Sequence, residues 1–425
     1  MCIVSLAGRP LYGLYYMIPF LPYRTMRDHF LDFPLGANVL TILVVAVIVG
    51  ALIRGKSLPK SKLFLIWAGY GIYLYFSMWI GTALGNAPAP LWLGDVNFVT
   101  WKDYMLIPMV FTAAGLVIED RKAIRTVVFL TAFSLVFIDR SCLLESMSRT
   151  WTNFDEEKRG GGPLGYGSNQ TAAFLAQFSM FFWGLALYLK RKKLKLLSYG
   201  LAAITVFTTM YTFSRGAYLA ILVSVLVLGL LKDRKLLLIL GVFMVSWQTI
   251  VPTPVRERVN MTQDSSGQLE ASAQERVLLW QNAENAFLHS PIVGSGFATF
   301  QYGEHVGDLK DTHNWYVKVL VETGIIGFAF AFLMLRQFLA TSYRLFKQAT
   351  DPLYQGLGLG LFLAFCACIV ANFFGDRWTY LEITSQLWVL MGCAARALQL
   401  NQMEIAKVSN EVNAPALVNP YIAYR

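Results

Sequence analysis

Repeated runs of about 20 apolar residues, such as Leu35–Ile53 and Leu63–Leu84, are the feature that most constrains how this chain folds. A helix of that length crosses the hydrocarbon core of a bilayer and satisfies all of its own backbone hydrogen bonds there. Apolar and aromatic residues make up 56% of the 425 residues and charged residues only 15%, a balance that disfavours a row of soluble domains. The sequence therefore predicts an all-α, multi-pass membrane protein.

The apolar runs predict about twelve transmembrane helices. The predicted spans are 3–22, 35–53, 63–85, 103–118, 124–139, 171–189, 194–212, 216–231, 235–251, 314–335, 356–374 and 381–398.

Basic residues gather on every second connection between these spans. The chain carries a net charge of +10, and its Lys and Arg residues cluster at 54–62, 121–125, 190–195, 232–235 and 336–347. Basic connections stay on the cytoplasmic side of a membrane. This rule places both termini in the cytoplasm, and since it accounts for the excess of positive charge, no nucleic-acid partner is expected.

Two connections are longer than the others, Ser141–Gln170 and Pro252–Thr312, and both fall on the predicted outer side. Long ordered loops in compact proteins usually serve a function. The predicted organisation is nine spans over 1–251, a large outer loop with an amphipathic helix over 252–313, three spans over 314–400, and a cytoplasmic tail over 401–425. No G-x-x-x-x-G-K-[ST] motif is present, so any outward-facing chemistry must use an activated substrate rather than ATP.

The sequence shows no metal site and no cleavable signal peptide. The five cysteines have neither zinc-binding nor redox spacing, and no His, Cys or Asp cluster has ligand spacing. Arg9 and Pro10 interrupt the first apolar run, which lacks a small-residue cleavage site. We therefore expect no cofactor and no bound metal.

Within the long outer loop, residues 268–289 predict an amphipathic helix. At 100° per residue, Leu279, Trp280, Ala283 and Phe287 fall within roughly 60° of Arg276. A charge in the middle of an apolar stripe either lies along the membrane surface or binds an anion. The sequence favours Arg276 as an anion ligand.

A second arginine, Arg215, occupies the outer turn between two apolar spans in Ser214-Arg-Gly216. Planar guanidinium groups can bind a diphosphate through paired hydrogen bonds. Arg215 and Arg276 are therefore candidate diphosphate ligands, with an interfacial anchor as the alternative for Arg215.

His313, at the start of the tenth predicted span, is a candidate general base because its ordinary pKa lies near 6.5. A helix-capping or packed surface histidine is the alternative. Further along the same span, Lys318 and Glu322 are four residues apart, and we expect them to neutralise each other in a structural role.

Weaker candidates lie on two other outer segments. Asp376 and Arg377, on the turn before the last span, either join the same site or pair with each other. Asn169 and Gln170 open the sixth span and either bind sugar hydroxyls or cap the helix.

These residues resemble the signature region of the O-antigen ligase and polymerase superfamily. The resemblance rests on Gln274-Glu-Arg276-x-x-x-Trp280, Ser290-Pro-Ile-Val-Gly-Ser-Gly296, His313-Asn-Trp-Tyr316, Glu322-Thr-Gly-Ile-Ile-Gly327 and the Ser214-Arg-Gly216 turn. The motifs lie between about residues 214 and 327, and the many spans with one large outer loop agree with the family plan.

The resemblance implies a GT-C-like, inverting and metal-independent glycosyltransferase of the bacterial inner membrane, with its active site on the periplasmic face. Its donor would be a glycan on undecaprenyl diphosphate, and its acceptor lipid A-core or another glycan. Arg215 and Arg276 match the family arginines that hold the donor diphosphate, and His313 matches the candidate base.

The sequence leaves several readings open. The stretch 165–170 departs from the Asn-Pro-Asn of many relatives, so no family role is carried over to Asn169. Ligases and polymerases share these motifs, and ligation onto lipid A-core is preferred by a small margin. A transporter of lipid-linked glycans is a further alternative, although no internal repeat supports it. A purely structural membrane protein would not explain Arg276 on an apolar face.

Overall fold

The computed structural model describes residues 1–24, 38–84, 87–155, 158–261, 271–302 and 312–413, and these residues form helices and connecting turns without a β-strand. In chain order, the elements are α1 (Cys2–Leu6), α2 (Pro10–Met17), η1 (Ile18–Phe20), α4 (Val39–Ile53), α5 (Lys62–Leu84), α6 (Val96–Val117), α7 (Arg121–Arg149), α8 (Ser168–Ala186), α9 (Lys192–Met210), α10 (Arg215–Leu231), α11 (Lys235–Ile250), α12 (Thr253–Asn260), α13 (Ala271–His289), η3 (Phe300–Tyr302), α14 (Trp315–Gln348), α15 (Pro352–Ala371), η4 (Asn372–Phe374) and α16 (Leu381–Asn413).

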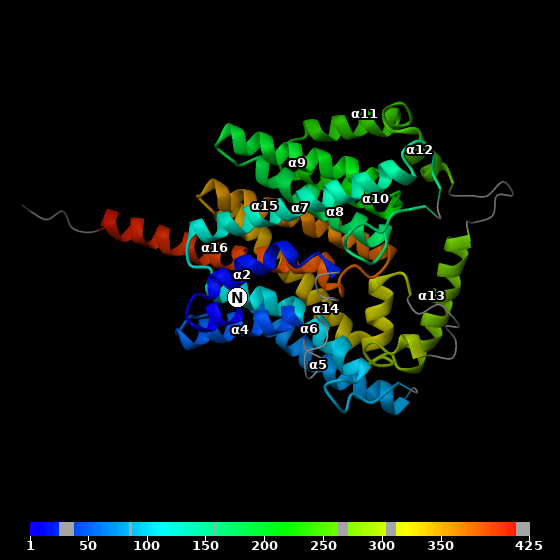
Figure 1. Ribbon diagram of the computed structural model, residues 1–425, viewed down its shortest axis with the longest axis horizontal. Coiled ribbons are helices and arrows are strands. Elements are labelled where there is room, and N and C mark those ends of the chain that lie inside the picture. Colours follow the sequence, from blue (N-terminus) through cyan, green and yellow to red (C-terminus); the bar gives the residue numbers. More distant parts are fainter. Residues whose placement is uncertain (25–37, 85–86, 156–157, 262–270, 303–311, 414–425) are drawn as a thin grey trace, which may run out of the picture.

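Most of the long helices run along the longest axis of the molecule, while α13 lies across one end of the bundle (Figure 1). The helices α8, α15 and α16 form the centre of the packing. Gly184 of α8 faces Gly360 of α15 so closely that a Cβ atom on Gly184 would lie 2.7 Å from the Gly360 Cα atom. Small residues let helix backbones approach in this way, as is common in membrane bundles. The helix α11, by contrast, buries none of its residues.

Within the described residues, four helical segments are long and apolar enough to cross a membrane, or five if the bent pair α11 and α12 is counted as one span. The four are Lys62–Leu84, Arg121–Arg149, Trp315–Gln348 and Pro352–Phe374. The prediction of about twelve spans is therefore not confirmed. The apolar helices α4 and α10, with 15 and 17 residues, are shorter than the roughly 20 residues that a bilayer requires.

Several predicted boundaries differ from the structure, among them the end of the span predicted over 314–335, since α14 continues to Gln348. The expected span 3–22 is instead three short helices, because Gly8, with φ of +109°, and Pro10 separate α1 from α2. The loop expected to begin at Ser141 begins later, since α7 continues to Arg149. The last helix, α16, continues past the predicted end of the final span to Asn413.

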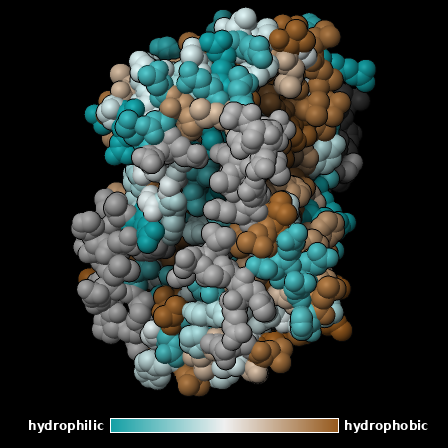
Figure 2. All heavy atoms as spheres, turned by 90° about the vertical axis from the view of Figure 1, so that its right-hand side faces the viewer, coloured by the Kyte–Doolittle hydropathy of each residue, from teal (hydrophilic) through white to brown (hydrophobic). Residues whose placement is uncertain are grey.

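Two of the predicted basic segments, 54–62 and 121–125, lie together at one end of the bundle, which we call the basic end, whereas the predicted basic connection 336–347 lies within α14. Lys56 forms an ion pair with Glu119, and the Arg121 Nε atom lies 2.5 Å from Asp351 Oδ2. These contacts join the connections before α5, before α7 and before α15. The opposite end carries α12 and α13 (Figure 1). Its face is rich in hydrophilic residues and is hollowed near the centre (Figure 2).

The helix α14 is broken at Gly324, where φ is +62° and ψ is −168°. The break frees backbone groups on both sides of it, and these pair with the loop 290–296 that follows α13. The Val321 and Glu322 carbonyl groups accept hydrogen bonds from the Ser295 and Gly296 amides at 2.9 and 2.8 Å, and the Ile325 and Ile326 amides donate to the Pro291 and Ile292 carbonyls at 2.9 and 3.3 Å. The Tyr73 hydroxyl also donates to the Thr323 carbonyl at 2.6 Å. The broken helix therefore fixes where α13 ends.

Substituting Gly324→Ala tests this joint. Alanine strains a backbone with positive φ, and its Cβ atom would overlap the Ile292 carbonyl group. We expect a loss of about 2–4 kcal/mol in unfolding free energy, seen as a lower thermal midpoint in detergent. Gly200→Ala in α9 is the matched control, because a Cβ atom there meets nothing within 4 Å. Equal midpoints for the two variants would contradict the role of the break.

Candidate functional site

Five arginines line one cavity of about 390 Å³ at the end of the bundle that carries α12 and α13. They come from five separate segments of the chain: Arg159 from the connection before α8, Arg215 from α10, Arg258 from α12, Arg276 from α13 and Arg377 from the turn before α16. The rest of the lining is Asn169 with Ala173, Phe213, Ser214, Gly216, Ala217, Leu219, Ala371 and Phe374. None of these lining residues is acidic. The cavity is therefore suited to an anion that also carries an apolar part.

Arg215 is the first residue of α10, so its guanidinium group lies at the positive end of the helix dipole. The chain enters this helix through Phe213, which has a positive φ of 56°. Gly216 then allows close packing, since a Cβ atom there would lie 2.8 Å from the Phe374 ring. A cation at a helix N-terminus does not stabilise the helix. An anion bound there interacts favourably with the helix dipole and with the Arg215 guanidinium group.

Arg276 reaches the cavity from α13. The helix predicted over 268–289 is present over Ala271–His289, and residues 268–270 lie outside the described residues. Leu279 and Ala283 are buried and pack with Val321 of α14 and with Phe300. Because Arg276 shares this face of the helix, docking of α13 on α14 turns it toward the cavity rather than outward.

The structure adds two arginines that the sequence did not single out. The Arg159 side chain donates to the Thr212 carbonyl and to Asn169 Oδ1, both at 3.0 Å. Arg258 is only 5% exposed, and its guanidinium group lies 5.1 Å from the centre of the Phe154 ring. Both belong to long connections predicted to lie on the outer side, but nothing in the sequence separates them from neighbours such as Arg256.

Two of the four weaker candidates line the cavity, and Asp376 and Gln170 do not. Arg377 and Asn169 line the cavity. The Asn169 side chain makes no capping hydrogen bond with α8 and instead accepts from Arg159, so the capping alternative is wrong for Asn169. Asp376 is fully buried and is not part of the cavity lining.

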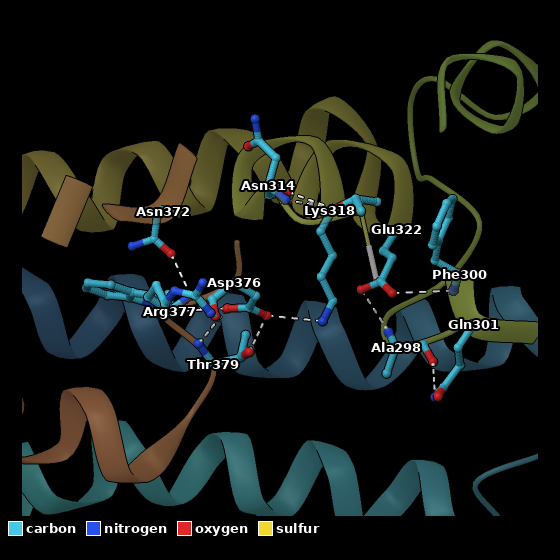
Figure 3. Close-up of polar contacts among 12 residues, drawn as sticks. Ala298, Phe300, Gln301, Asn314, Lys318, Glu322, Asn372, Asp376, Arg377 and Thr379 are labelled. Atoms are coloured by element: carbon cyan, nitrogen blue, oxygen red, sulfur yellow. Dashed lines mark hydrogen bonds and ion pairs between the residues drawn. The ribbon is translucent and has the colours of Figure 1, made fainter. Parts of the chain in front are cut away.

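Asp376 pairs with Lys318 at 3.1 Å, whereas Glu322 points the other way along α14 (Figure 3). The Glu322 carboxylate accepts hydrogen bonds from the Ala298 and Phe300 amides at 3.1 and 3.3 Å. The predicted pairing of Lys318 with Glu322 is therefore replaced by two separate structural contacts. The reason is tertiary: the turn before α16 brings a carboxylate to Lys318, and the segment after Gly296 brings free amides to Glu322.

The Lys318 contact also sets the charge of Asp376. Burial raises the pKa of the Asp376 carboxyl, but the Lys318 ammonium and hydrogen bonds from Thr379 outweigh burial and hold that pKa below its ordinary value. Asp376 is therefore ionised at neutral pH. Its ion pair with Lys318 connects α14 to the turn that carries Arg377.

His313 lies beside this region but is not among the residues that line the cavity. It has a positive φ of 51° and directly precedes Asn314, whose side chain caps α14 by accepting from the Tyr316 amide at 3.0 Å. The Trp280 indole donates to the Thr312 carbonyl at 3.0 Å. This bond connects the segment that contains His313 to α13. Trp280 lies one turn after Arg276 on that helix.

Removing the cation with Lys318→Met leaves Asp376 buried without its ion-pair partner. We expect a loss of about 3–5 kcal/mol in unfolding free energy at pH 7, measured by thermal unfolding in detergent. In the wild type, the lowered pKa of Asp376 stabilises the folded protein at pH values above the ordinary carboxyl pKa of 3.8. This stabilisation is lost as the pH falls through the lower pKa of Asp376 in the folded protein. In the variant, burial raises that pKa, so the folded state takes up a proton and the difference from wild type shrinks as pH falls from 7 to 5.

Lys56→Met is the matched control, because its ion pair with Glu119 is exposed and contributes less than about 1 kcal/mol. The ion pair would have no stabilising role if Lys318→Met lowered the unfolding free energy no more than the control does. An equal loss at pH 7 and pH 5 would contradict the buried charge on Asp376.

Comparison with known proteins bears on the same part of the chain. Residues 200–332 match the family model described as O-antigen ligase. No curated protein matches the chain. The matched region contains Arg215, Arg276 and His313, together with the loop and the broken helix that position α13. The resemblance seen in the motifs is therefore confirmed over residues 200–332, where the chain is similar to the O-antigen ligase family.

Proposed function

We propose that this protein is an inverting, metal-independent membrane glycosyltransferase that moves a glycan from undecaprenyl diphosphate to the hydroxyl group of an acceptor sugar. The family match supports ligase- or polymerase-type transfer in a multi-pass membrane protein. The observation that carries the proposal is the meeting of Arg215 and Arg276 in one arginine-lined cavity. These residues are 61 positions apart in the sequence, and the fold brings them together.

The cavity suits a departing diphosphate. As the bond between the anomeric carbon and the diphosphate oxygen breaks, negative charge grows on the phosphates, and preorganised guanidinium groups stabilise it. Arg215 and Arg276 hold the diphosphate in this scheme, and the N-terminus of α10 adds a favourable dipole. The sugar is already activated by its leaving group, so the transfer uses no nucleotide.

His313 is the proposed base. The acceptor hydroxyl oxygen attacks the anomeric carbon from the side opposite the diphosphate, its proton passes to the imidazole, and the carrier diphosphate leaves. A single displacement of this kind inverts the configuration. His313 lies outside the cavity lining but is tied to α13 through Thr312 and Trp280, which suits a base that works on an acceptor at the cavity edge.

The remaining cavity wall suits the lipid carrier. Ala173, Ala217 and Ala371 are small and apolar, and Leu219 is 44% exposed on the outer surface of α10. An isoprenoid chain could leave the diphosphate site along this wall and enter the bilayer. The ligand of the cavity would then be a diphosphate ester on a long apolar chain, which is the chemical structure of a carrier lipid.

We place the cavity on the periplasmic side of the bacterial inner membrane, with both termini in the cytoplasm. The basic end of the bundle is opposite to the end that holds the cavity, as the positive-inside rule requires of this orientation. The same location disfavours the alternative of a lipid-linked glycan transporter, whose binding site belongs near the bilayer midplane.

Ligation of O-antigen onto lipid A-core is our first choice, and polymerisation of carrier-linked repeat units is the alternative. Purified protein would be given an undecaprenyl-diphosphate glycan with either lipid A-core or further carrier-linked repeats, without ATP or added metal. Product on lipid A-core establishes a ligase, and longer carrier-linked chains establish a polymerase. No product with either acceptor, from folded protein, would contradict the proposal.

Removing Arg276 or His313 should abolish transfer. We expect Arg276→Ala and His313→Ala each to lower the transfer rate at least about a hundredfold, because each removes a group that acts in the transition state. Membrane insertion and the thermal midpoint should stay close to wild type. Loss of folded protein in both variants would instead assign these residues structural roles.

Arg215→Lys separates bidentate binding from simple charge. Lysine keeps the positive charge but cannot present two parallel N–H donors, so we expect transfer to stay impaired by about tenfold or more. Rates measured against salt concentration would check this, since a purely electrostatic effect falls as salt rises. Full activity with lysine would reduce Arg215 to a generic cation.

A further inference from the structure

Arg258 combines three properties that set it apart from the other basic residues of the outer segments. It lines the arginine cavity, it is only 5% exposed, and its guanidinium group lies over the Phe154 ring at 5.1 Å. Burial of an arginine along a cavity wall is unfavourable without compensation by counter-charge or ring contacts. The fold holds this side chain against the space where the proposed ligand binds.

The position of Arg258 depends on the same turn that presents Arg215. Val255, one turn earlier on α12, is buried with Phe213 in one apolar cluster. Phe154 packs edge-on against Phe213 with ring centres 5.0 Å apart. Phe213 therefore supports both the ring beneath Arg258 and the start of α10, so the two arginines are held in a fixed relation.

The needs of a diphosphate exceed what two arginines supply. Two guanidinium groups bound through paired hydrogen bonds offer four donors, whereas a diphosphate ester has more acceptor sites on its oxygens than that. A third guanidinium from another wall of the cavity can contact oxygens that Arg215 and Arg276 leave unsatisfied. Such a contact would favour a diphosphate over a monophosphate, which has fewer oxygens and less charge.

We infer that Arg258 is a third phosphate-binding residue of the cavity and selects a lipid diphosphate over a lipid monophosphate, with Phe154 as its positioning residue. This inference rests on the proposed function, because it takes the cavity ligand to be the carrier-linked diphosphate.

Binding to the full-length protein in lipid nanodiscs tests the inference. The probes are undecaprenyl diphosphate, undecaprenyl monophosphate and inorganic pyrophosphate, each used to compete with a labelled undecaprenyl diphosphate. For Arg258→Gln we expect affinity for the lipid diphosphate to fall about tenfold or more, with a smaller loss for the monophosphate. Phe154→Leu should lower diphosphate affinity about two- to fivefold, because the arginine remains but its ring contact is lost.

Arg256→Gln is the matched control. Arg256 lies two residues away on the same short helix, but its side chain donates to the Gln248 carbonyl at 2.6 Å and to Thr253 Oγ1 at 2.8 Å, and it does not line the cavity. We expect this variant to bind all three probes as the wild type does. If Arg258→Gln does not fold, Arg258→Lys decides, since it keeps the cation but not the paired donors.

Each outcome separates this inference from the proposed function. Wild-type affinity in Arg258→Gln, or in Arg258→Lys where that variant decides, overturns the role of Arg258, even if Arg276→Ala has abolished transfer. An equal loss for mono- and diphosphate overturns the selectivity. Pyrophosphate binding as tight as that of the lipid diphosphate overturns the lipid source. Failure of transfer by wild-type protein contradicts the proposed function, yet the binding arms still test Arg258.

Discussion

The break in α14 at Gly324 is the interaction on which the rest of the site depends. An unbroken helix would satisfy its own backbone groups and would offer nothing to the loop 290–296. The positive φ at Gly324 instead exposes carbonyl and amide groups that pair with that loop. Glu322 strengthens the joint by accepting hydrogen bonds from the Ala298 and Phe300 amides. The end of α13 is fixed in this way, and Arg276 is carried to the cavity.

The cavity is assembled from chain segments that have little else in common. The start of α10, the helix α12 and the turn before α16 bring Arg215, Arg258 and Arg377 to one space, together with Arg159 from the connection before α8. Like charges repel, so their convergence has to be maintained by the packing around them. The Phe154, Phe213 and Val255 cluster does this on one side, and the ion pair of Lys318 with Asp376 does it on the other. The resulting field favours a multiply charged anion.

The motif residues that carry the family resemblance divide into two groups with different tasks. Arg215 and Arg276 face the cavity and belong to the proposed chemistry. Gly294, Gly296, Glu322 and Gly324 touch no ligand space and instead join the loop to the broken helix. A short motif in a sequence does not reveal this division, because a glycine needed for a backbone joint and a glycine next to a substrate look the same. The close approach of Gly296 to α5 appears only in the fold.

The sequence by itself determined the all-helical class and the helix that carries Arg276, since these follow from composition and from periodicity along one segment. It did not determine how many helices are long enough to span a bilayer, because an apolar run does not show where the backbone breaks, as it does at Gly8 in the first run. Only the tertiary structure decided that Lys318 pairs with Asp376 and that Arg159 and Arg258 join the cavity. These contacts link residues far apart in the chain, and their partners are chosen by helix packing rather than by spacing in the sequence.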